Sequence, residues 1–300
     1  MARWLWLSIL AAALFGVWGA LIELPEKHFQ PGFPATLGYV VWSLTMLPCA
    51  LLVLRRIGWR MDRSPKAIWY GAVVGLLGAA GQLALFKALM DGPAYLVFPV
   101  ISLVPTVTIV MSVLILRERA HALASLGVLL SLVAIFLLSL RPSDTRTPLD
   151  GHRWLFGAAG ALVMWGMQSY FVKASAGSVS SESLFCYMTV SALVLAPVAW
   201  SMTDWSLLVN WGLSGPYLTA LIQMANSVGA LVFVFALRSG KALLVAPTVN
   251  GLYPVITIVL SLVLYTRRPE YWNGLGMVLA VAAVMLMSYG ETLSKREVIG

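Results

Sequence analysis

The chain has 300 residues, of which 60% are hydrophobic and only 11% are charged, with a formal net charge of +8. A soluble protein carries about 25% charged residues, so this composition excludes a water-soluble fold and indicates that a lipid bilayer is the solvent. The basic residues lie in short segments between apolar runs, where they set topology. The positive charge therefore does not indicate a nucleic-acid partner.

Runs of about 20 apolar residues have the length that crosses the hydrocarbon core as a helix. The connections between these runs are short, and none is long enough for a soluble domain. We predict an all-α integral membrane protein with ten transmembrane helices, at 3–22, 33–54, 67–90, 93–116, 121–140, 154–176, 183–203, 213–237, 241–266 and 271–289.

The apolar pattern occurs twice along the chain. Matched residues recur at a nearly constant spacing: Pro105 and Pro254, Thr108 and Thr257, and, upstream, Trp18-Gly19 and Trp165-Gly166. The first run resembles a signal peptide, but its Trp-Gly pair has a counterpart in the second copy, so we interpret it as a retained helix. Five helices per copy is an odd number, so the second copy must enter the membrane from the opposite side. This predicts two inverted five-helix repeats around a central cavity, an arrangement typical of a transporter.

The repeats define the expected organisation of the chain. We place the first repeat, with helices 1–5, at 1–142, a polar linker at 143–153, the second repeat, with helices 6–10, at 154–290 and a tail at 291–300. Thirteen of the 20 Lys and Arg residues fall on one side of this arrangement, and the loop 55–66 dominates the bias. The positive-inside rule then predicts that both termini are cytoplasmic.

Charged residues are placed at the edges of the predicted helices. Every Asp and Glu lies at or beyond a helix end, whereas proton- or sodium-driven carriers commonly hold a carboxylate near the midplane. We therefore expect transport without obligatory proton movement. Glu23 is interpreted as an interfacial residue, with a proton-coupling acid as the alternative. Lys87 is interpreted as a snorkelling lysine, with a contact to a substrate carboxylate as the alternative.

The sequence offers no catalytic set. Cys49 and Cys186 lie inside apolar runs and are expected to be inert packing residues rather than a disulfide. The three histidines fall in loops without metal-ligand spacing: His28, His121 and His152. We expect neither an enzyme, nor a metal site, nor a cofactor.

Prolines mark the fourth and ninth helices as unusual. The fourth contains Pro99 and Pro105, and the ninth contains Pro247 and Pro254. Each proline lacks a donor and frees the carbonyl four residues before it, which must be satisfied inside the protein or by a ligand. We predict that the helices are broken at Pro99 and Pro247 and that all four prolines act as hinges. The alternative is a kink used only for packing.

Polar and aromatic residues deep in the apolar runs are the next signal, because amides are costly against lipid and should face the bundle interior. Gln168, Gln223, Trp18 and Trp42 belong to this group. Interhelical hydrogen bonds and core packing are the alternatives. We predict a neutral, aromatic-lined cavity suited to a small zwitterion, with these substrate-binding residues: Gln82, Tyr95, Phe98, Ser102, Trp165, Asn226, Asn250 and Tyr253.

Some of these residues carry a family resemblance. The two Trp-Gly pairs, and the stretch from Phe86 through Pro105 to Gly127, resemble the EamA-type repeat of the drug/metabolite transporter superfamily. Within it, the chain resembles bacterial exporters of aromatic amino acids and methionine. The resemblance implies ten helices, cytoplasmic termini, a central cavity and alternating access. The second copy departs from the pattern, since Thr266-Arg267-Arg268 stands where the first has Arg117-Glu118-Arg119.

The sequence therefore predicts a multi-pass transporter of the bacterial inner membrane that exports amino acids and related small metabolites, or facilitates their movement. One alternative is a multidrug carrier for lipophilic cations, which should have a buried acid. Another is an intramembrane enzyme of lipid metabolism. The expected partners are a small-molecule substrate and the bilayer, with no obligate protein partner.

Overall fold

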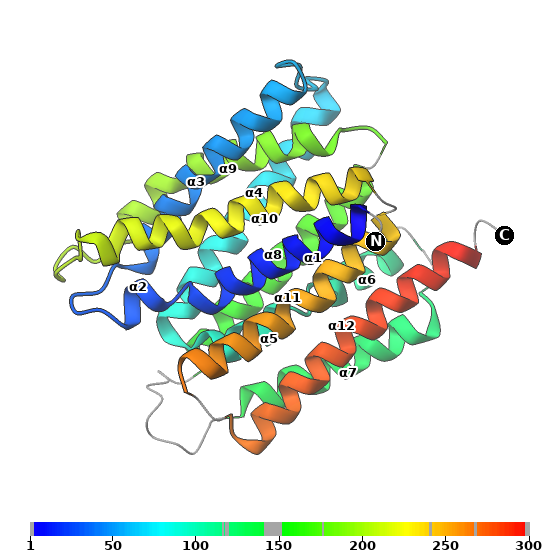
Figure 1. The fold of residues 1–300 in the computed structure, drawn as a ribbon. Coiled ribbons are helices and arrows are strands. Elements are labelled where there is room, and N and C mark those ends of the chain that lie inside the picture. The colour runs from blue at the N-terminus through cyan, green and yellow to red at the C-terminus, as the bar shows by residue number, and fades with distance from the viewer. Residues whose placement is uncertain are drawn as a thin grey trace.

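The computed structural model describes residues 3–115, 117, 120–140, 152–175, 177–239, 242–266 and 269–297. In this part of the chain every regular element is a helix, and the helices lie side by side in one bundle (Figure 1). The all-α prediction is confirmed. The elements are α1 Arg3–Leu21, α2 Leu24–Lys27, α3 Ala35–Arg56, α4 Pro65–Asp91, α5 Ala94–Ile101, α6 Val104–Ile115, α7 Ala122–Ser139, α8 Arg153–Ala174, α9 Ser181–Ser201, the π-helical turn η1 Leu213–Tyr217, α10 Leu218–Ser239, α11 Ala242–Leu264 and α12 Tyr271–Glu297.

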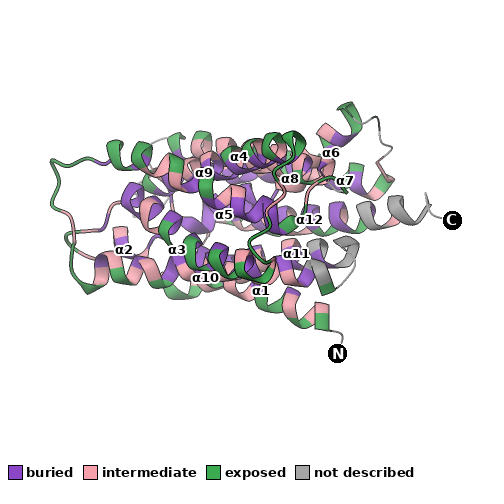
Figure 2. Cartoon of the chain, turned by 90° about the horizontal axis from the view of Figure 1, so that it is seen from above, coloured by how far each residue is buried: buried purple, intermediate pink, exposed green. Residues whose placement is uncertain are grey.

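The helices have the length and composition of membrane spans. Within the described residues, nine helical segments are long and apolar enough to cross a bilayer, and the apolar helix Thr248–Leu264 inside α11 is shorter. Buried residues lie along the inner faces of the helices and exposed ones along the outer faces (Figure 2). The exposed side chains include large apolar ones such as Leu129, Phe136 and Leu221, as expected where lipid replaces water.

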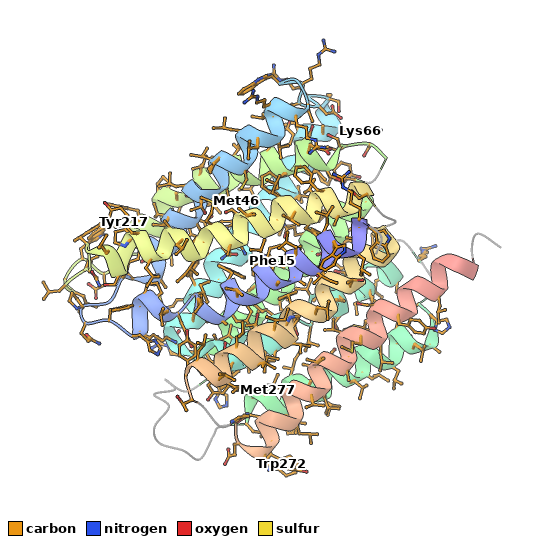
Figure 3. The ribbon with its side chains drawn as sticks, in the orientation of Figure 1. Phe15, Met46, Lys66, Tyr217, Trp272 and Met277 are labelled. Carbon is orange, nitrogen blue, oxygen red and sulfur yellow. The ribbon has the colours of Figure 1, made fainter. Side chains whose placement is uncertain are left out.

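The two ends of the bundle are distinct. The first turn of α1 and the last turns of α12 lie at one end, which we call the terminal end (Figure 1). Figure 3 places Lys66 toward this end, and Tyr217 and Trp272 at the opposite end, which we call the far end. Both ends of the chain on one side agree with an even number of crossings.

The helix contacts follow the repeat. α1 packs on α10 and α11, and the equivalent helices pair in the same way, since α8 packs on α4 and α6. The remaining large contacts are α3 with α10, its counterpart α9 with α4, and the self-equivalent pairs α3–α9 and α7–α12. Most of these contacts join one repeat to the other. The two halves therefore form one interdigitated bundle.

One hydrogen bond pattern shows how the halves differ. Thr108 Oγ1 donates to the Gly166 carbonyl at 3.1 Å, and its repeat counterpart Thr257 donates to the Gly16 carbonyl at 3.2 Å. Gly166 corresponds to Gly19, which lies about one helical turn after Gly16. The two equivalent interfaces are thus offset by about one turn, a displacement of the size that packed helices make between states.

The helix breaks do not lie where the prolines predicted them. The fourth span is broken at Ser102 and Leu103, between α5 and α6, and Pro99 lies inside α5. Pro105 is the closer cause, because it cannot donate to the Ile101 carbonyl and it disfavours helical geometry in the residue before it. The predicted break at Pro99 is therefore wrong by one turn.

The predicted break at Pro247 is also wrong. α11 runs without interruption from Ala242 to Leu264, through both Pro247 and Pro254. A proline removes one backbone hydrogen bond, but the helix continues when the neighbouring bonds and the packing hold it. The two copies therefore differ at the equivalent span, which is divided in the first repeat and continuous in the second.

Candidate functional site

A cavity of about 260 Å³ lies between the two repeats, in the middle of the bundle. Its wall comes from nine helices: α1, α3, α4, α5, α6, α8, α9, α10 and α11. Seven of the eight predicted binding residues line it: Gln82, Phe98, Ser102, Trp165, Asn226, Asn250 and Tyr253. The inverted repeats thus bring residues that are far apart in sequence to one central space. Transporters with inverted repeats typically bind their substrates at the interface between the repeats.

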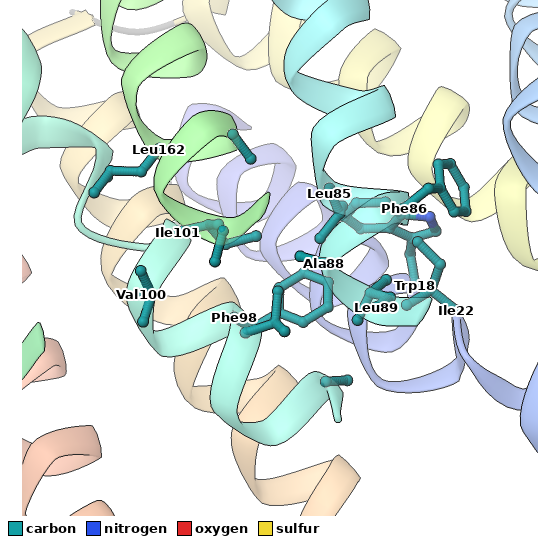
Figure 4. Packing of buried hydrophobic residues seen from close by; sticks show 14 of the residues in the cluster. Trp18, Ile22, Leu85, Phe86, Ala88, Leu89, Phe98, Val100, Ile101 and Leu162 are labelled. Carbon is teal, nitrogen blue, oxygen red and sulfur yellow. The ribbon is translucent and has the colours of Figure 1, made fainter. Parts of the chain in front are cut away.

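Tyr95 is the predicted residue that does not line the cavity. It is 4% exposed and belongs to the large hydrophobic cluster. Phe98, one turn later on α5, lines the cavity and meets Trp18 edge to face at a centroid distance of 5.7 Å. Figure 4 shows Trp18, Phe86, Leu89 and Phe98 packed close together between α1, α4 and α5. Of the two aromatic rings, Phe98 is the one at the cavity wall.

A tryptophan sets the orientation of the Asn226 amide. Trp42 Nε1 donates to Asn226 Oδ1 at 2.9 Å, and both residues line the cavity. An indole N–H can only donate, so the carbonyl end of the amide must face Trp42. The Nδ2 group of Asn226 is then the end left for the cavity.

A backbone carbonyl sets the orientation of the Gln168 amide on α8. Gln168 Nε2 donates to the Val74 carbonyl of α4 at 3.1 Å, and Trp165 Nε1 donates to the Gly78 carbonyl at 3.1 Å. Both partners are on α4, where a Cβ at Gly78 would collide with the Gln168 amide, and a Cβ at Gly81 would lie 2.5 Å from Trp165 Cδ1. The absence of side chains at these two glycines lets α8 place Trp165 and Gln168 in the wall.

Gln82 on α4 and Ser102, which follows the last residue of α5, complete the polar wall. Gln82 is 3% exposed, and its Nε2 has no hydrogen-bond partner among the described residues. Ser102 Oγ donates to the Pro99 carbonyl at 2.8 Å. An unpaired buried amide is costly, and a ligand or water in the cavity would satisfy it.

The cavity wall is electrically neutral. Among the described residues that line it there is no Asp, Glu, Lys, Arg or His. The one predicted hinge that reaches it is Pro105, whereas Pro99 and Pro254 are buried and the side chain of Pro247 lies outside what the structure describes. Lys87 is also remote from the cavity, since it is half exposed and pairs with Asp91 at 3.9 Å. Lys87 is therefore not among the described residues of the cavity wall.

A buried, paired carboxylate lies instead at the far end, beyond the Trp18–Phe98 contact. Glu23 is 4% exposed, and its Oε2 accepts from Lys27 Nζ at 3.0 Å and from the Ala94 backbone N–H at 3.1 Å. Lys27 Nζ also donates to the Gly92 carbonyl at 2.7 Å. We call these four residues the far-end latch, because they tie the α1–α2 segment to the junction of α4 and α5. Glu23 is thus buried and paired beyond the end of α1.

Sequence reasoning missed several lining residues, among them Phe15, Met46, Ser169 and Met188. Met46 lies four residues after Trp42, and Phe15 three before Trp18, so helical periodicity from the noted tryptophans could have found both. Met188 carried no such signal. In the described residues no group of three or more His, Cys, Asp or Glu is placed to hold a metal ion, and Cys49 and Cys186 are buried free thiols.

An all-helical bundle of membrane length, with inverted repeats around a polar cavity, defines a membrane transporter. The EamA-like transporter family matches this chain twice, over residues 2–140 and 152–289. The chain belongs to this family. The two matched segments cover the two repeats, so the predicted resemblance to EamA-type transporters is confirmed.

Two further comparisons agree with the duplicated architecture. An uncharacterized protein of Methanocaldococcus jannaschii is 28% identical over 134 residues, which is 45% of this chain and 94% of the archaeal one. Its length thus corresponds to about one repeat. A protein of known crystal structure superposes with a TM-score of 0.62 at 17% identity, over 98% of this chain and 99% of that one. At this identity the likeness shows the fold alone.

Proposed function

We propose that this transporter exports amino acids and related small metabolites, or facilitates their movement, by alternating access across a bacterial inner membrane. The observation that carries the proposal is the cavity wall, whose described residues carry no charge and combine amide groups from α4, α8, α10 and α11 with the rings of Trp18, Phe98, Trp165 and Tyr253. A zwitterion has no net charge and needs both donors and acceptors, whereas its side chain needs apolar contact. This wall supplies all three.

The same wall argues against the other substrate class. A carrier for lipophilic cations is expected to hold an acidic group at membrane depth, and the described lining residues contain none. We further propose that both termini are cytoplasmic, because the loop 55–66 is rich in basic residues. In this proposal the repeats span 1–142 and 154–290, the linker is 143–153 and the tail is 291–300. The transporter needs no obligatory protein partner.

The moving parts in this proposal are the proline-containing spans. α5 and α6 are separated beside the cavity, and Pro105 lies both at this break and in the wall. Discontinuous helices of this kind form the sites of many transporters. We propose that Pro99 and Pro105 in the first repeat, and Pro247 and Pro254 in the second, allow the bending that opens the cavity to either side.

Uptake into proteoliposomes tests the substrate class. Purified protein is reconstituted and assayed with a panel of labelled amino acids and one cationic dye, with protein-free vesicles as the control. Uptake of at least one amino acid, inhibited by the unlabelled compound, supports the proposal. Uptake of the dye alone would assign the protein to the cation class instead.

Gln82→Ala and Asn226→Ala test the site. A hydrogen bond to a charged group is worth about 1.5–3 kcal/mol, so each change should raise the KM about tenfold or more. Asn273→Ala is a suitable control, because Asn273 is as deeply buried as Gln82 but donates to carbonyls at the C-terminal end of α7, outside the cavity. Wild-type KM in both cavity variants, with folded protein, would place the substrate elsewhere.

A further inference from the structure

The cavity contains two amides whose orientation is settled by their partners, and the two orientations are opposite. Trp42 Nε1 holds Asn226 by its oxygen at 2.9 Å, and the Val74 carbonyl holds Gln168 by its nitrogen at 3.1 Å. Exchanging oxygen and nitrogen in either amide would set donor against donor or acceptor against acceptor. These assignments therefore follow from the chemistry of the partners.

The remaining half of each amide is available to a ligand. Within the described part of the chain, no residue accepts a hydrogen bond from Asn226 Nδ2 and none donates one to Gln168 Oε1, and both residues line the cavity. The wall thus presents an N–H donor from α10 and a carbonyl acceptor from α8. The site has a direction that a neutral, symmetric lining would lack.

The other cavity amides do not add a fixed direction. Gln82 is 3% exposed with its Nε2 unpaired, and for Asn250 no hydrogen bond is found among the described residues. Either amide can turn to offer its oxygen or its nitrogen to a ligand. Gln82 is nevertheless the second sign of a ligand at this place, because a buried N–H group without a partner is rare in native proteins.

A zwitterion matches this arrangement in only one orientation. A carboxylate accepts hydrogen bonds and an ammonium group donates them. We propose that the Asn226 Nδ2 group binds the carboxylate of the substrate and that the Gln168 Oε1 group binds its ammonium, so that these two residues determine preference for zwitterions over amines and over acids. This inference rests on the proposed function, since it assigns the two poles of an amino-acid substrate to the same cavity.

Three ligands with one side chain test the assignment. Phenylalanine carries both charges, phenethylamine lacks the carboxylate and 3-phenylpropionate lacks the ammonium group. Each is used to inhibit uptake of a labelled amino acid that the wild-type protein transports in proteoliposomes. For the wild type, phenylalanine should inhibit at least tenfold better than either single-charge compound.

Two isosteric charge changes separate the poles. Asn226→Asp keeps an oxygen for Trp42 but replaces the free donor by an anion, so phenylalanine and 3-phenylpropionate should each inhibit at least tenfold less well, with phenethylamine unaffected or improved. Gln168→Glu loses the hydrogen bond to the Val74 carbonyl but places an anion beside the proposed ammonium pole, so phenethylamine should inhibit at least tenfold better. Gln223→Glu is the matched control, because Gln223 accepts from Trp18 Nε1 at 2.8 Å but does not line the cavity; its ligand preference should remain that of the wild type.

The outcomes distinguish this inference from the proposed function. The opposite pattern in the two variants would mean that the substrate lies the other way round, and equal changes for all three ligands would mean that the amides only hold the helices together. If a charged variant does not fold, Asn226→Ala should weaken 3-phenylpropionate selectively and Gln168→Ala should weaken phenethylamine selectively. If the wild type takes up no amino acid, the proposed function fails, and the poles are still tested by quenching of tryptophan fluorescence with the amine and the acid alone.

Discussion

A methyl group added at Gly81 should displace the Trp165 ring from the cavity wall. The new Cβ would lie 2.5 Å from Trp165 Cδ1 and 2.6 Å from its Nε1, whereas ordinary contacts begin at 3.4 Å. The indole must therefore move by about 1 Å, because α4 and α8 are closely packed along their length. This movement breaks the 3.1 Å bond from Trp165 Nε1 to the Gly78 carbonyl.

The size of the effect follows from that bond. A typical hydrogen bond contributes about 0.5–1.5 kcal/mol net, and about 1.4 kcal/mol corresponds to a factor of ten. Gly81→Ala should thus raise the KM for uptake about two- to tenfold. Gly160→Ala is the control, because its Cβ would lie 3.7 Å from Ala84 across the same α4–α8 interface, an ordinary contact. Both proteins are compared with the wild type in proteoliposomes after their melting temperatures in detergent have been measured.

A second substitution makes the test specific. The atoms that collide all lie beyond the Cβ of Trp165, so alanine at this position removes them. Gly81→Ala should therefore have little further effect in a Trp165→Ala background, so the two changes should be strongly non-additive. A wild-type KM for a folded Gly81→Ala protein, or fully additive effects in the double variant, would refute the reasoning.

Three other expectations concern topology and motion. Ser206→Cys and Arg60→Cys introduce thiols at exposed positions on opposite sides of the proposed topology. An impermeant thiol reagent added to intact cells should label only the Ser206→Cys protein, with little background because Cys49 and Cys186 are buried. Labelling of the Arg60→Cys protein alone would reverse the orientation. Glu23→Gln weakens the far-end latch by about 1.5 kcal/mol or more, so a Ser102→Cys reporter in the cavity should label faster from outside. Lys87→Gln should leave the labelling rate of this reporter unchanged, because the exposed pair of Lys87 with Asp91 contributes little. Equal labelling rates with the reporter alone, with Glu23→Gln and with Lys87→Gln would show that the far-end latch does not control access to the cavity. Pro105→Ala restores a donor for the Ile101 carbonyl and should slow turnover without raising the KM, so a wild-type rate would contradict the hinge role.

Much of the site was foreseeable from residue type alone. Amides and aromatic rings inside apolar runs are unfavourable against lipid, and the structure turns Gln82, Asn226 and Asn250 toward a common cavity. Tyr95 satisfies the same rule without reaching the cavity, because burial in a packed cluster also removes a residue from lipid. Residue type thus separates interior from exterior, but it does not separate cavity from core.

The prolines show a second limit. Each lacks a backbone donor wherever it occurs, yet α11 continues through two of them while the fourth span divides at Ser102 and Leu103. Whether a helix breaks depends on what neighbouring helices supply to the freed carbonyls. Sequence symmetry at Pro105 and Pro254 therefore did not produce structural symmetry.

By itself, the sequence determined the membrane environment, the helical class and the inverted duplication. The length of the apolar runs, the placement of charges and the odd number of helices in each repeat can all be read directly from the order of the residues. The tertiary structure alone decided which end of each amide faces the cavity, that Gly78 and Gly81 admit Gln168 and Trp165, and that Glu23 is held by Lys27 and Ala94. These features depend on contacts between helices that are distant in sequence. Their geometry exists only once the two repeats have packed against each other.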